Sequence, residues 1–156
     1  MAVTGYWYPK SISVAFGFET QTLDWVADSA SIKCALMNSN FTGGNQSQTA
    51  ADYWNDVSGN ECATVTNYTA GGKTVGTTTL TTTAGSGKTI TFGGGATTVW
   101  TTATLTARGA VVYKALAQAS DSPVVFYLDF GDDVPYSAGD FTITWHANGM
   151  ATITVA

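Results

Sequence analysis

The sequence predicts a mainly β fold: an antiparallel β-sandwich or jelly-roll-like barrel, with one or two short helices in the N-terminal half. Roughly one residue in six is Thr, whose branched side chain favours extended backbone. Apolar and polar residues alternate through 104–113 and 141–146, as in strands with one buried face. Gly and Asn turn signals separate these strands at the spacing of sandwiches and barrels. The 156 residues are expected to form a single domain, 1–156, with a core of its own.

The first predicted helix covers residues 9–19. Pro9 suits a first helical position, and Ile12 and Phe16 lie four residues apart on one face. Gly17 weakens this helical pattern, so a strand is the alternative for the segment.

A strand and a second short helix follow. The strand is predicted over 31–37, with the even-numbered residues from Ile32 to Leu36 on one face. After a polar loop, Thr49-Ala-Ala-Asp52 resembles a capping box that would open a helix over 53–57. A Ser-Gly-Asn sequence is expected to end this helix.

The middle third of the chain is dominated by Thr, Gly and Val. Two glycine turns, one ending at Lys73 and one at Lys88, separate strands predicted at Thr74–Thr83 and Thr89–Phe92. The run Thr77–Thr83 alternates too little to bury one face well. It is therefore predicted to be an edge strand or a strand that contacts a partner.

The last third has the clearest strand pattern. Val124–Phe130 is nearly all apolar, as a central strand with two covered faces would be. Asp129-Phe-Gly131 copies the metal-binding triplet of protein kinases, but the other kinase motifs are missing, so it is predicted to end that strand at a turn. Asn148-Gly149 tolerates positive φ and predicts a hairpin that joins Phe141–Trp145 to Ala151–Val155.

The chain is acidic and has few charged residues, which limits the classes of partner that it could bind. Its net charge is −5, and only 11% of its residues are charged. The six Lys and Arg residues are scattered, so we expect neither nucleic-acid nor membrane binding. No secretory signal or membrane-length apolar run is visible, which predicts a protein made in a cytoplasm. A surface with so little charge suits a protein packed against other subunits.

The residues that could do chemistry do not form recognisable sites. The glycine that should open a phosphate loop is missing before Lys73 and before Lys88. His146 is the single histidine and is expected to face outward, away from Phe141 and Trp145. No nucleophile–base pair stands out, so we expect no enzyme, no catalytic residue and no cofactor.

Metal binding is not predicted either. Asp132, Asp133 and Asp140 match no calcium-loop spacing and are interpreted as solvated turn carboxylates. Cys34 and Cys62 could pair in space, but a reducing compartment favours two free, buried thiols.

Two features of the sequence each allow two interpretations. Arg108, the only arginine, is either an exposed strand residue or a buried, bidentate partner of an acid such as Asp129. Tyr6, Trp7 and Tyr8 either pack in the core or anchor the chain to a partner. The other tryptophans expected to stabilise the domain are Trp25, Trp54 and Trp100.

Short blocks stand in a distinctive order along nearly the whole chain. They are Ala2–Lys10, Asp24-Trp25, Ile32–Met37, Asp52–Trp54, Asp56-Val57, Tyr68–Lys73, Trp100–Arg108, Ala110–Tyr113, Ser122-Pro123, Leu128–Gly131, Phe141–Trp145 and Asn148-Gly149. In this order they resemble a family of tailed-bacteriophage virion structural proteins. The chain departs from the family in the Gly/Asn-rich segment after Phe41, where a Pro-containing loop is expected. It also departs at Gly109, where relatives commonly carry a larger residue.

The resemblance implies a capsid decoration (cement) protein or another head or tail accessory protein, with no catalytic residues. Such a protein would be assembled in the host cytoplasm and bind the major capsid protein on the outer surface of the head, between capsomers. It would stabilise the shell against internal DNA pressure, as a homo-oligomer, either a dimer or a trimer. The residues predicted to contact partners are Tyr6, Trp7, Tyr8, Thr77, Thr79, Thr81 and Thr83. The alternative functions are a head- or tail-fibre adhesion module that binds a host receptor or glycan, and a tail hydrolase.

Overall fold

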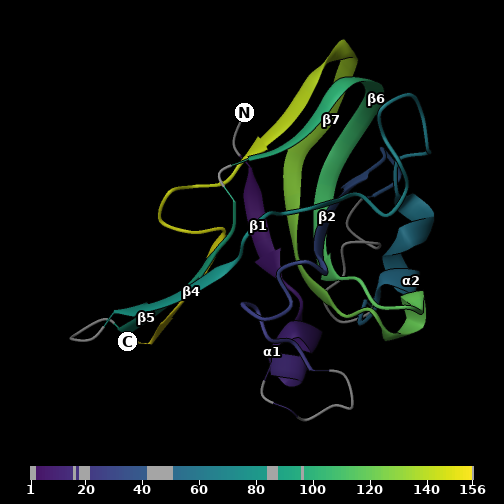
Figure 1. Ribbon diagram of the computed structural model, residues 1–156. Coiled ribbons are helices and arrows are strands. Elements are labelled where there is room, and N and C mark those ends of the chain that lie inside the picture. The colour runs from purple at the N-terminus through teal and green to yellow at the C-terminus, as the bar shows by residue number, and fades with distance from the viewer. Residues whose placement is uncertain are drawn as a thin grey trace.

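Two antiparallel sheets and two short helices make up the computed structural model (Figure 1), which describes residues 3–15, 17, 22–41, 51–83, 88–95 and 97–155. The strands are β1 (Thr4–Trp7), β2 (Ile32–Met37), β3 (Lys73–Thr74), β4 (Thr79–Thr83), β5 (Lys88–Gly93), β6 (Thr97–Lys114), β7 (Val124–Thr144) and β8 (Ala151–Val155). The helices are α1 (Pro9–Ala15) and α2 (Trp54–Val57), and single 3-10 turns lie at Ser58–Asn60 and Ala119–Asp121. The predicted mainly β class, with short helices in the N-terminal half, is confirmed.

The large sheet has the strand order β1-β7-β6-β2-β3 and is covered on both faces. On β2, Ile32, Cys34 and Leu36 share one buried face, as predicted, while Ala35 and Met37 are buried on the other. The core on the first face is built around Trp100, which is fully buried. The large sheet therefore forms the middle layer of the molecule.

The long hairpin of β6 and β7 forms the spine of that sheet, and it corrects one prediction. Asp129-Phe-Gly131 does not end a strand, because β7 continues to Thr144. Gly131 has a φ of +81°, and its N–H donates a 2.8 Å hydrogen bond to Asp129 Oδ1. In the pairing, β7 advances from Asp129 to Val134 while β6 moves only from Gly109 to Ala107. The triplet is therefore a bulge inside a strand, a feature that turn residues permit as readily as a strand end.

Gly109 of β6 pairs with Asp129 of β7 and leaves no room for a side chain. A Cβ on this residue would lie 2.5 Å from the carbonyl oxygen of Leu128.

The small sheet has the order β4-β5-β8, and it overturns the predicted C-terminal hairpin. Gly149 adopts a φ of +110°, as an Asn-Gly turn allows. However, β8 pairs with β5, with Ile153 opposite Ile90, and not with the strand that precedes the turn. The N–H of Met150 donates a 2.7 Å hydrogen bond to Phe92 O, so the turn passes the chain from one sheet to the other.

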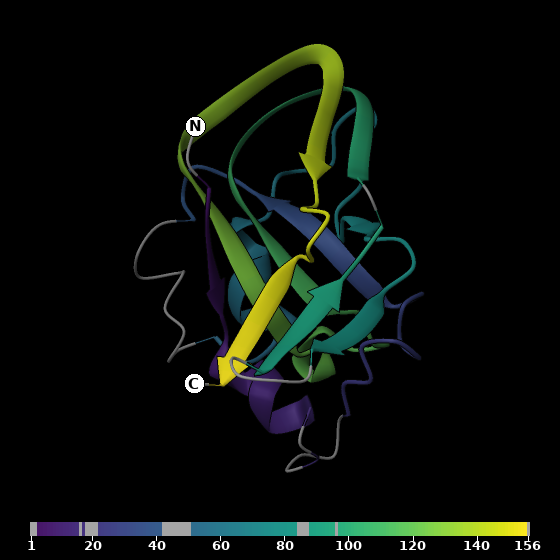
Figure 2. The same cartoon turned by 90° about the vertical axis from the view of Figure 1, so that its left-hand side faces the viewer.

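The two sheets form an open β-sandwich. Figure 2 shows β8 and β5 in front of the large sheet. Phe92 of β5 packs edge-on against Trp7 of β1, with ring centroids 4.9 Å apart. Beyond this contact β4 and β5 extend away from the large sheet (Figure 1), so the small sheet projects from the body.

The helices agree with the predictions in position and differ in detail. The first helix covers Pro9–Ala15, while Phe16 and residues 18–21 lie outside the described residues. The second helix is capped by Asp56, whose carboxylate accepts the N–H groups of Asp52 and Tyr53 at 3.0 and 2.9 Å. Thr49, which was predicted to open the capping box, lies outside the described residues. The α-helix ends at Val57 with Ser58 as its C-cap, so the Ser-Gly-Asn sequence ends it as predicted, and Ser58–Asn60 then form a 3-10 turn.

Several core predictions are confirmed. Trp25, Trp54 and Trp100 are buried. Cys34 and Cys62 are buried, free thiols. The longest helix in the described part of the chain has seven residues, and none of its helices could span a bilayer.

Candidate interaction surfaces

The projecting small sheet carries a regular face of threonine side chains. Paired residues on antiparallel strands point to the same side. The register aligns Thr81 with Thr91 and Thr152, and Thr83 with Thr89 and Thr154. Thr79 extends the face on β4, opposite Gly93. All five β4 side chains are exposed, as are Thr152 and Thr154 on β8.

The opposite face of the small sheet is mostly apolar, although Thr82 of β4 also lies on it, and it looks toward the large sheet. It presents Leu80, Ile90, Phe92 and Ile153, which line a cavity of about 540 Å³ together with Trp7 and other residues of the body. Leu80 lies at the outer margin of this face and is 46% exposed. The small sheet therefore buries its inner face only in part.

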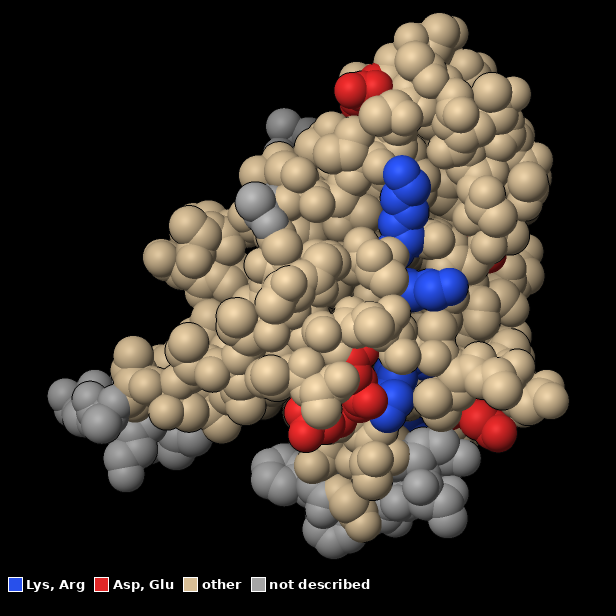
Figure 3. Space-filling model, viewed as in Figure 1, with Lys and Arg blue, Asp and Glu red and all other residues tan. Residues whose placement is uncertain are grey.

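Both edge strands of the small sheet, β4 and β8, consist of uncharged residues without proline. The face visible in Figure 3 has no charged side chain over the described part of this projecting sheet, while Lys, Arg, Asp and Glu lie on the body. Charged side chains and proline are the usual protection of a sheet edge against pairing with another strand. This sheet lacks both at its edges.

Trp25 attaches the small sheet to the body. Its indole N–H donates to Gly93 O at 2.8 Å, and its ring packs against Phe92 and Phe126 with centroids 5.6 and 6.4 Å apart. The hydroxyl of Thr78 donates to Trp25 O, at the residue before β4 begins. The start of β4 is thereby held while the strand itself extends outward.

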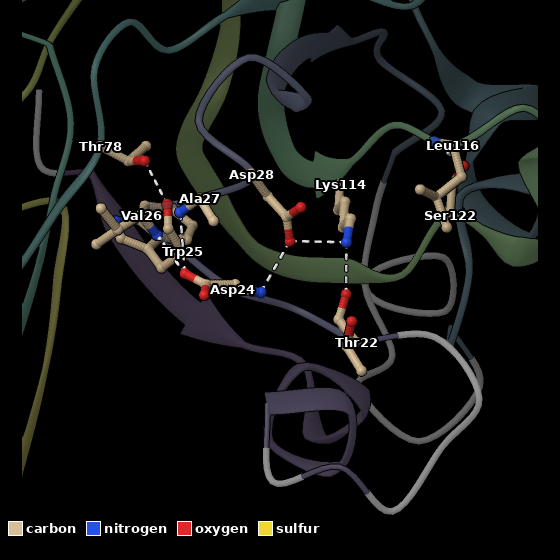
Figure 4. A network of polar contacts seen from close by, with 10 residues as sticks. All are labelled: Thr22, Asp24, Trp25, Val26, Ala27, Asp28, Thr78, Lys114, Leu116 and Ser122. Carbon is tan, nitrogen blue, oxygen red and sulfur yellow. Dashed lines mark hydrogen bonds and ion pairs between the residues drawn. The ribbon is translucent and has the colours of Figure 1, made fainter.

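The segment that carries Trp25 is itself fixed by a polar network (Figure 4). Lys114 Nζ, at the end of β6, lies 2.7 Å from Asp28 Oδ2 and donates to Thr22 O at 2.5 Å. Asp28 Oδ2 also accepts the N–H of Asp24 at 2.8 Å. Lys114 is buried, so its charge requires this partner. The attachment of the small sheet thus continues into the large sheet.

A second apolar cleft, of about 590 Å³, lies on the curved part of β7. Its lining includes Leu128, Phe130, Phe141, Trp145 and Tyr136. Tyr136 is 37% exposed, so an aromatic face is accessible there. The sequence pattern contained no signal for this cleft, because its lining combines residues of β7 with Val3 and Met150 from other parts of the chain.

The structure separates the residues predicted to contact partners. Tyr6 is 41% exposed and stacks on Tyr127 with centroids 4.8 Å apart. Trp7 is half-buried against Phe92. Tyr8 is fully buried, and this burial raises the pKa of its hydroxyl above the usual range. A partner could therefore reach Tyr6 but not Tyr8, whose inclusion among the contact residues is wrong. Thr77 is exposed in a bend before β4, and Thr79, Thr81 and Thr83 are exposed within it.

Arg108 fits neither of its two predicted environments. Its Nε lies 3.9 Å from Asp129 Oδ1, and one terminal nitrogen lies 3.9 Å from Asp132 Oδ1. Its side chain is 27% exposed, so the residue is half-buried and makes two loose ion pairs rather than one bidentate contact.

The remaining polar residues that were considered as site candidates do not form a common site. His146 is exposed, and its Nδ1 accepts the N–H of Asn148 at 3.1 Å. Asp132, Asp133 and Asp140 are exposed, and Asp140 accepts the N–H of Thr102 at 3.1 Å. Within the described residues, no three His, Cys, Asp or Glu side chains gather closely enough to hold a metal ion.

One buried polar cluster has no counterpart in the sequence predictions. Glu61 Oε1 accepts the hydroxyl of Tyr68 at 2.7 Å and the N–H of Gly71 at 2.6 Å, and Tyr68 Oη accepts the N–H of Leu36 at 2.9 Å. Burial raises the pKa of Glu61, although these hydrogen bonds act in the opposite direction. The cluster ties the loop before β3 to β2, which is a structural role.

No protein-family model, curated protein or solved structure matches this chain.

Proposed function

We propose that this chain is a non-enzymatic virion structural protein of a tailed phage, most specifically a capsid decoration (cement) protein. It binds the major capsid protein on the outer surface of the head, between capsomers, and stabilises the shell against internal DNA pressure. The proposal rests on the resemblance in the order of sequence blocks and on one structural observation, the projecting small sheet.

The small sheet supports a role in contacting a partner, because most of its surface does not pack against the rest of the chain. Only its inner face packs against the body, and that face is covered in part. Its uncharged edges and its threonine face offer backbone groups and hydroxyls for hydrogen bonds. A strand that exposes unpaired backbone groups is a ready template for contact with another chain.

Binding alone suffices for the proposed mechanism. A ligand that binds only the assembled shell stabilises that state by mass action. Many symmetric copies, or linked pairs of copies, convert a modest contact into high avidity. The contact residues proposed here are Tyr6 and the β4 region with Thr77, Thr79, Thr81 and Thr83. Because these residues are neutral, binding should depend weakly on salt.

The test uses heads of the encoding phage prepared without this protein, to which the purified chain is added back. We expect saturable binding in hundreds of copies and an increase in the temperature at which heads release DNA. Thr142→Ala, at an exposed threonine of β7 outside the small sheet, is the matched control for Thr79→Ala combined with Thr83→Ala. Heads equally heat-stable with and without the protein would overturn the proposal.

The adhesion module remains the second candidate because of one observation, the apolar cleft on β7 with the exposed ring of Tyr136. Aromatic rings in such clefts can stack on sugars. All five tryptophans are buried or half-buried, which leaves Tyr6 and Tyr136 as the exposed rings in the described residues. A few copies at a fibre tip and binding to a host glycan, lost in Tyr136→Ala, would favour this function over decoration.

A further inference from the structure

The outer side of β4 is an open sheet edge. β4 pairs with β5 on one side, and in the described part of the chain no strand pairs with its other side. Its five residues carry no charge and no proline. By contrast, the edge strand β3 of the large sheet is only two residues long and contains Lys73. The edge of β4 is therefore long and unprotected by comparison.

The other edge of the small sheet is less accessible. Ala151 and Thr152 of β8 line a small cleft together with Gly5 and Trp7 of β1, so the body lies close to that side. β4 is thus the better edge for adding a strand.

We infer that β4 pairs with β4 of a second copy of this chain, antiparallel across a two-fold axis, so that two small sheets become one six-stranded sheet. In an isologous interface each strand must complement itself. β4 does so because it is neutral, and no like charges face each other across the axis.

The register follows from the start of β4 and from pairing the whole strand. Thr78, just before the strand, is buried and bonded to Trp25, so it cannot extend the pairing. Centring the axis on Thr81 pairs all five residues, with Thr79 opposite Thr83 of the second copy. Centring it on Leu80 would pair only 79–81. A shift by a single residue would bring a threonine-face residue opposite an apolar-face residue.

The exposed Leu80 favours a second copy as the occupant. In the register centred on Thr81, Leu80 lies opposite Thr82 of the other strand and diagonal to the other Leu80. Diagonal neighbours in an antiparallel pair are about 7–8 Å apart, within reach of long side chains. The two leucines, each 46% exposed in the single chain, would then cover each other.

The pairing also joins the surfaces on either side of it. The threonine faces of the two copies would form one face across six strands, and the apolar faces would meet beneath it. The dimer itself does not depend on the proposed function. If that function holds, the joined threonine face is the surface presented to the shell.

A cysteine placed on the axis tests both the contact and its register. Directly opposite residues in an antiparallel pair have Cα atoms about 4.5–5.5 Å apart, within the range of a disulfide. Thr81→Cys should therefore form a covalent dimer in the full chain under mild oxidation. The two native thiols should not compete, because both are buried and burial raises the pKa of Cys62 to about 12 and that of Cys34 further.

Thr79→Cys is the matched control, because it lies on the same strand and face but opposite residue 83 of the other copy. Alone it should cross-link far less than Thr81→Cys, and an equimolar mixture of Thr79→Cys and Thr83→Cys should form the mixed dimer. Equal cross-linking of Thr79→Cys and Thr81→Cys alone would contradict the register and indicate random collision.

Sedimentation of the unmodified chain supplies a measurement without cysteine. We expect a monomer–dimer equilibrium that Thr81→Lys weakens by about tenfold or more, because it places like charges opposite each other. Thr152→Lys, on the other edge, should leave the equilibrium unchanged, and circular dichroism should show that both variants are folded. A wild-type chain that stays monomeric at its highest soluble concentration would overturn the inference, as would dimerisation sensitive only to Thr152→Lys. If the chain dimerises as inferred but does not bind the phage heads, only the proposed function is contradicted.

Discussion

The large and small sheets are built from similar strand-forming residues, but the large sheet is buried and the small sheet is mostly exposed. The large sheet buries both faces, and its central strands are rich in Val, Ala and aromatic residues. The small sheet buries one face in part and exposes threonine on the other. β-branched side chains favour strands in both settings, but only the apolar ones stabilise a strand through burial. The comparison shows that strand formation and core formation are separate properties of this chain.

The largest difference between the sheets should appear in the cost of truncating a side chain. Trp100→Ala removes a fully buried ring from the core on the first face of the large sheet and should lower the free energy of unfolding by about 3–5 kcal/mol. Leu80→Ala, on the projecting sheet, should change it by less than about 0.5 kcal/mol under conditions where the chain is monomeric. Urea denaturation of both variants measures this. Comparable losses would mean that the small sheet is part of the main cooperative core.

A smaller effect should follow from loosening the attachment between the sheets. Trp25→Phe removes the indole N–H that donates to Gly93 O and should cost about 1 kcal/mol. Its effect should be local, because the lost hydrogen bond joins Trp25 directly to β5. Hydrogen exchange should accelerate in β5 and β8 and stay unchanged in β6 and β7. Trp54→Phe, where the native ring stacks on Tyr113 on the far face of the large sheet, is the control and should leave β5 unaffected.

The smallest effect concerns Glu61, the half-buried carboxyl that ties the loop before β3 to β2. The pKa of Glu61 is raised above 4.5 in the folded chain, so between pH 4.5 and the raised pKa the folded state binds more protons than the unfolded state. Stability contributed by this group is therefore present at acidic pH and decreases as the pH rises through that window.

Glu61→Gln should remove this pH dependence, because the amide oxygen can still accept from Tyr68 and Gly71 without a charge. Melting temperatures measured from pH 4.5 to neutrality should fall less with pH in the variant than in the wild type. Asp52→Asn, at an exposed carboxyl, is the matched control. A variant with the wild-type slope would assign the pH dependence to other groups.

Much of the fold could be predicted because it depends on local pattern. The alternation of Phe141, Ile143 and Trp145 with threonines predicted which side chains are buried, and the structure confirms it. The positive φ of Gly149 follows from the same kind of local information. The partner of β8 could not be predicted, since alternation shows which face of a strand is buried but not which strand lies beside it.

The candidate surfaces were predictable only in part. The uncharged threonine run in β4 was visible in the sequence, and its exposure agrees with an edge strand. Tyr6 and Tyr8 could not be separated from the sequence alone, because two aromatic residues flanking Trp7 are equally suited to a core or an interface. Tyr8 is buried because it belongs to the core on the second face of the large sheet, together with Met37 and Tyr127.

The sequence by itself determined that this chain forms antiparallel strands, where most of them lie and that its surface has little charge. Only the tertiary structure decided that the last strand joins β5, that Trp25 fastens the small sheet and that β4 remains as an open edge. The physical reason is that backbone preference and side-chain alternation act between near neighbours in the chain. Pairing and edge exposure depend on contacts between residues far apart in sequence, such as Trp25 with Gly93 and Lys114 with Asp28.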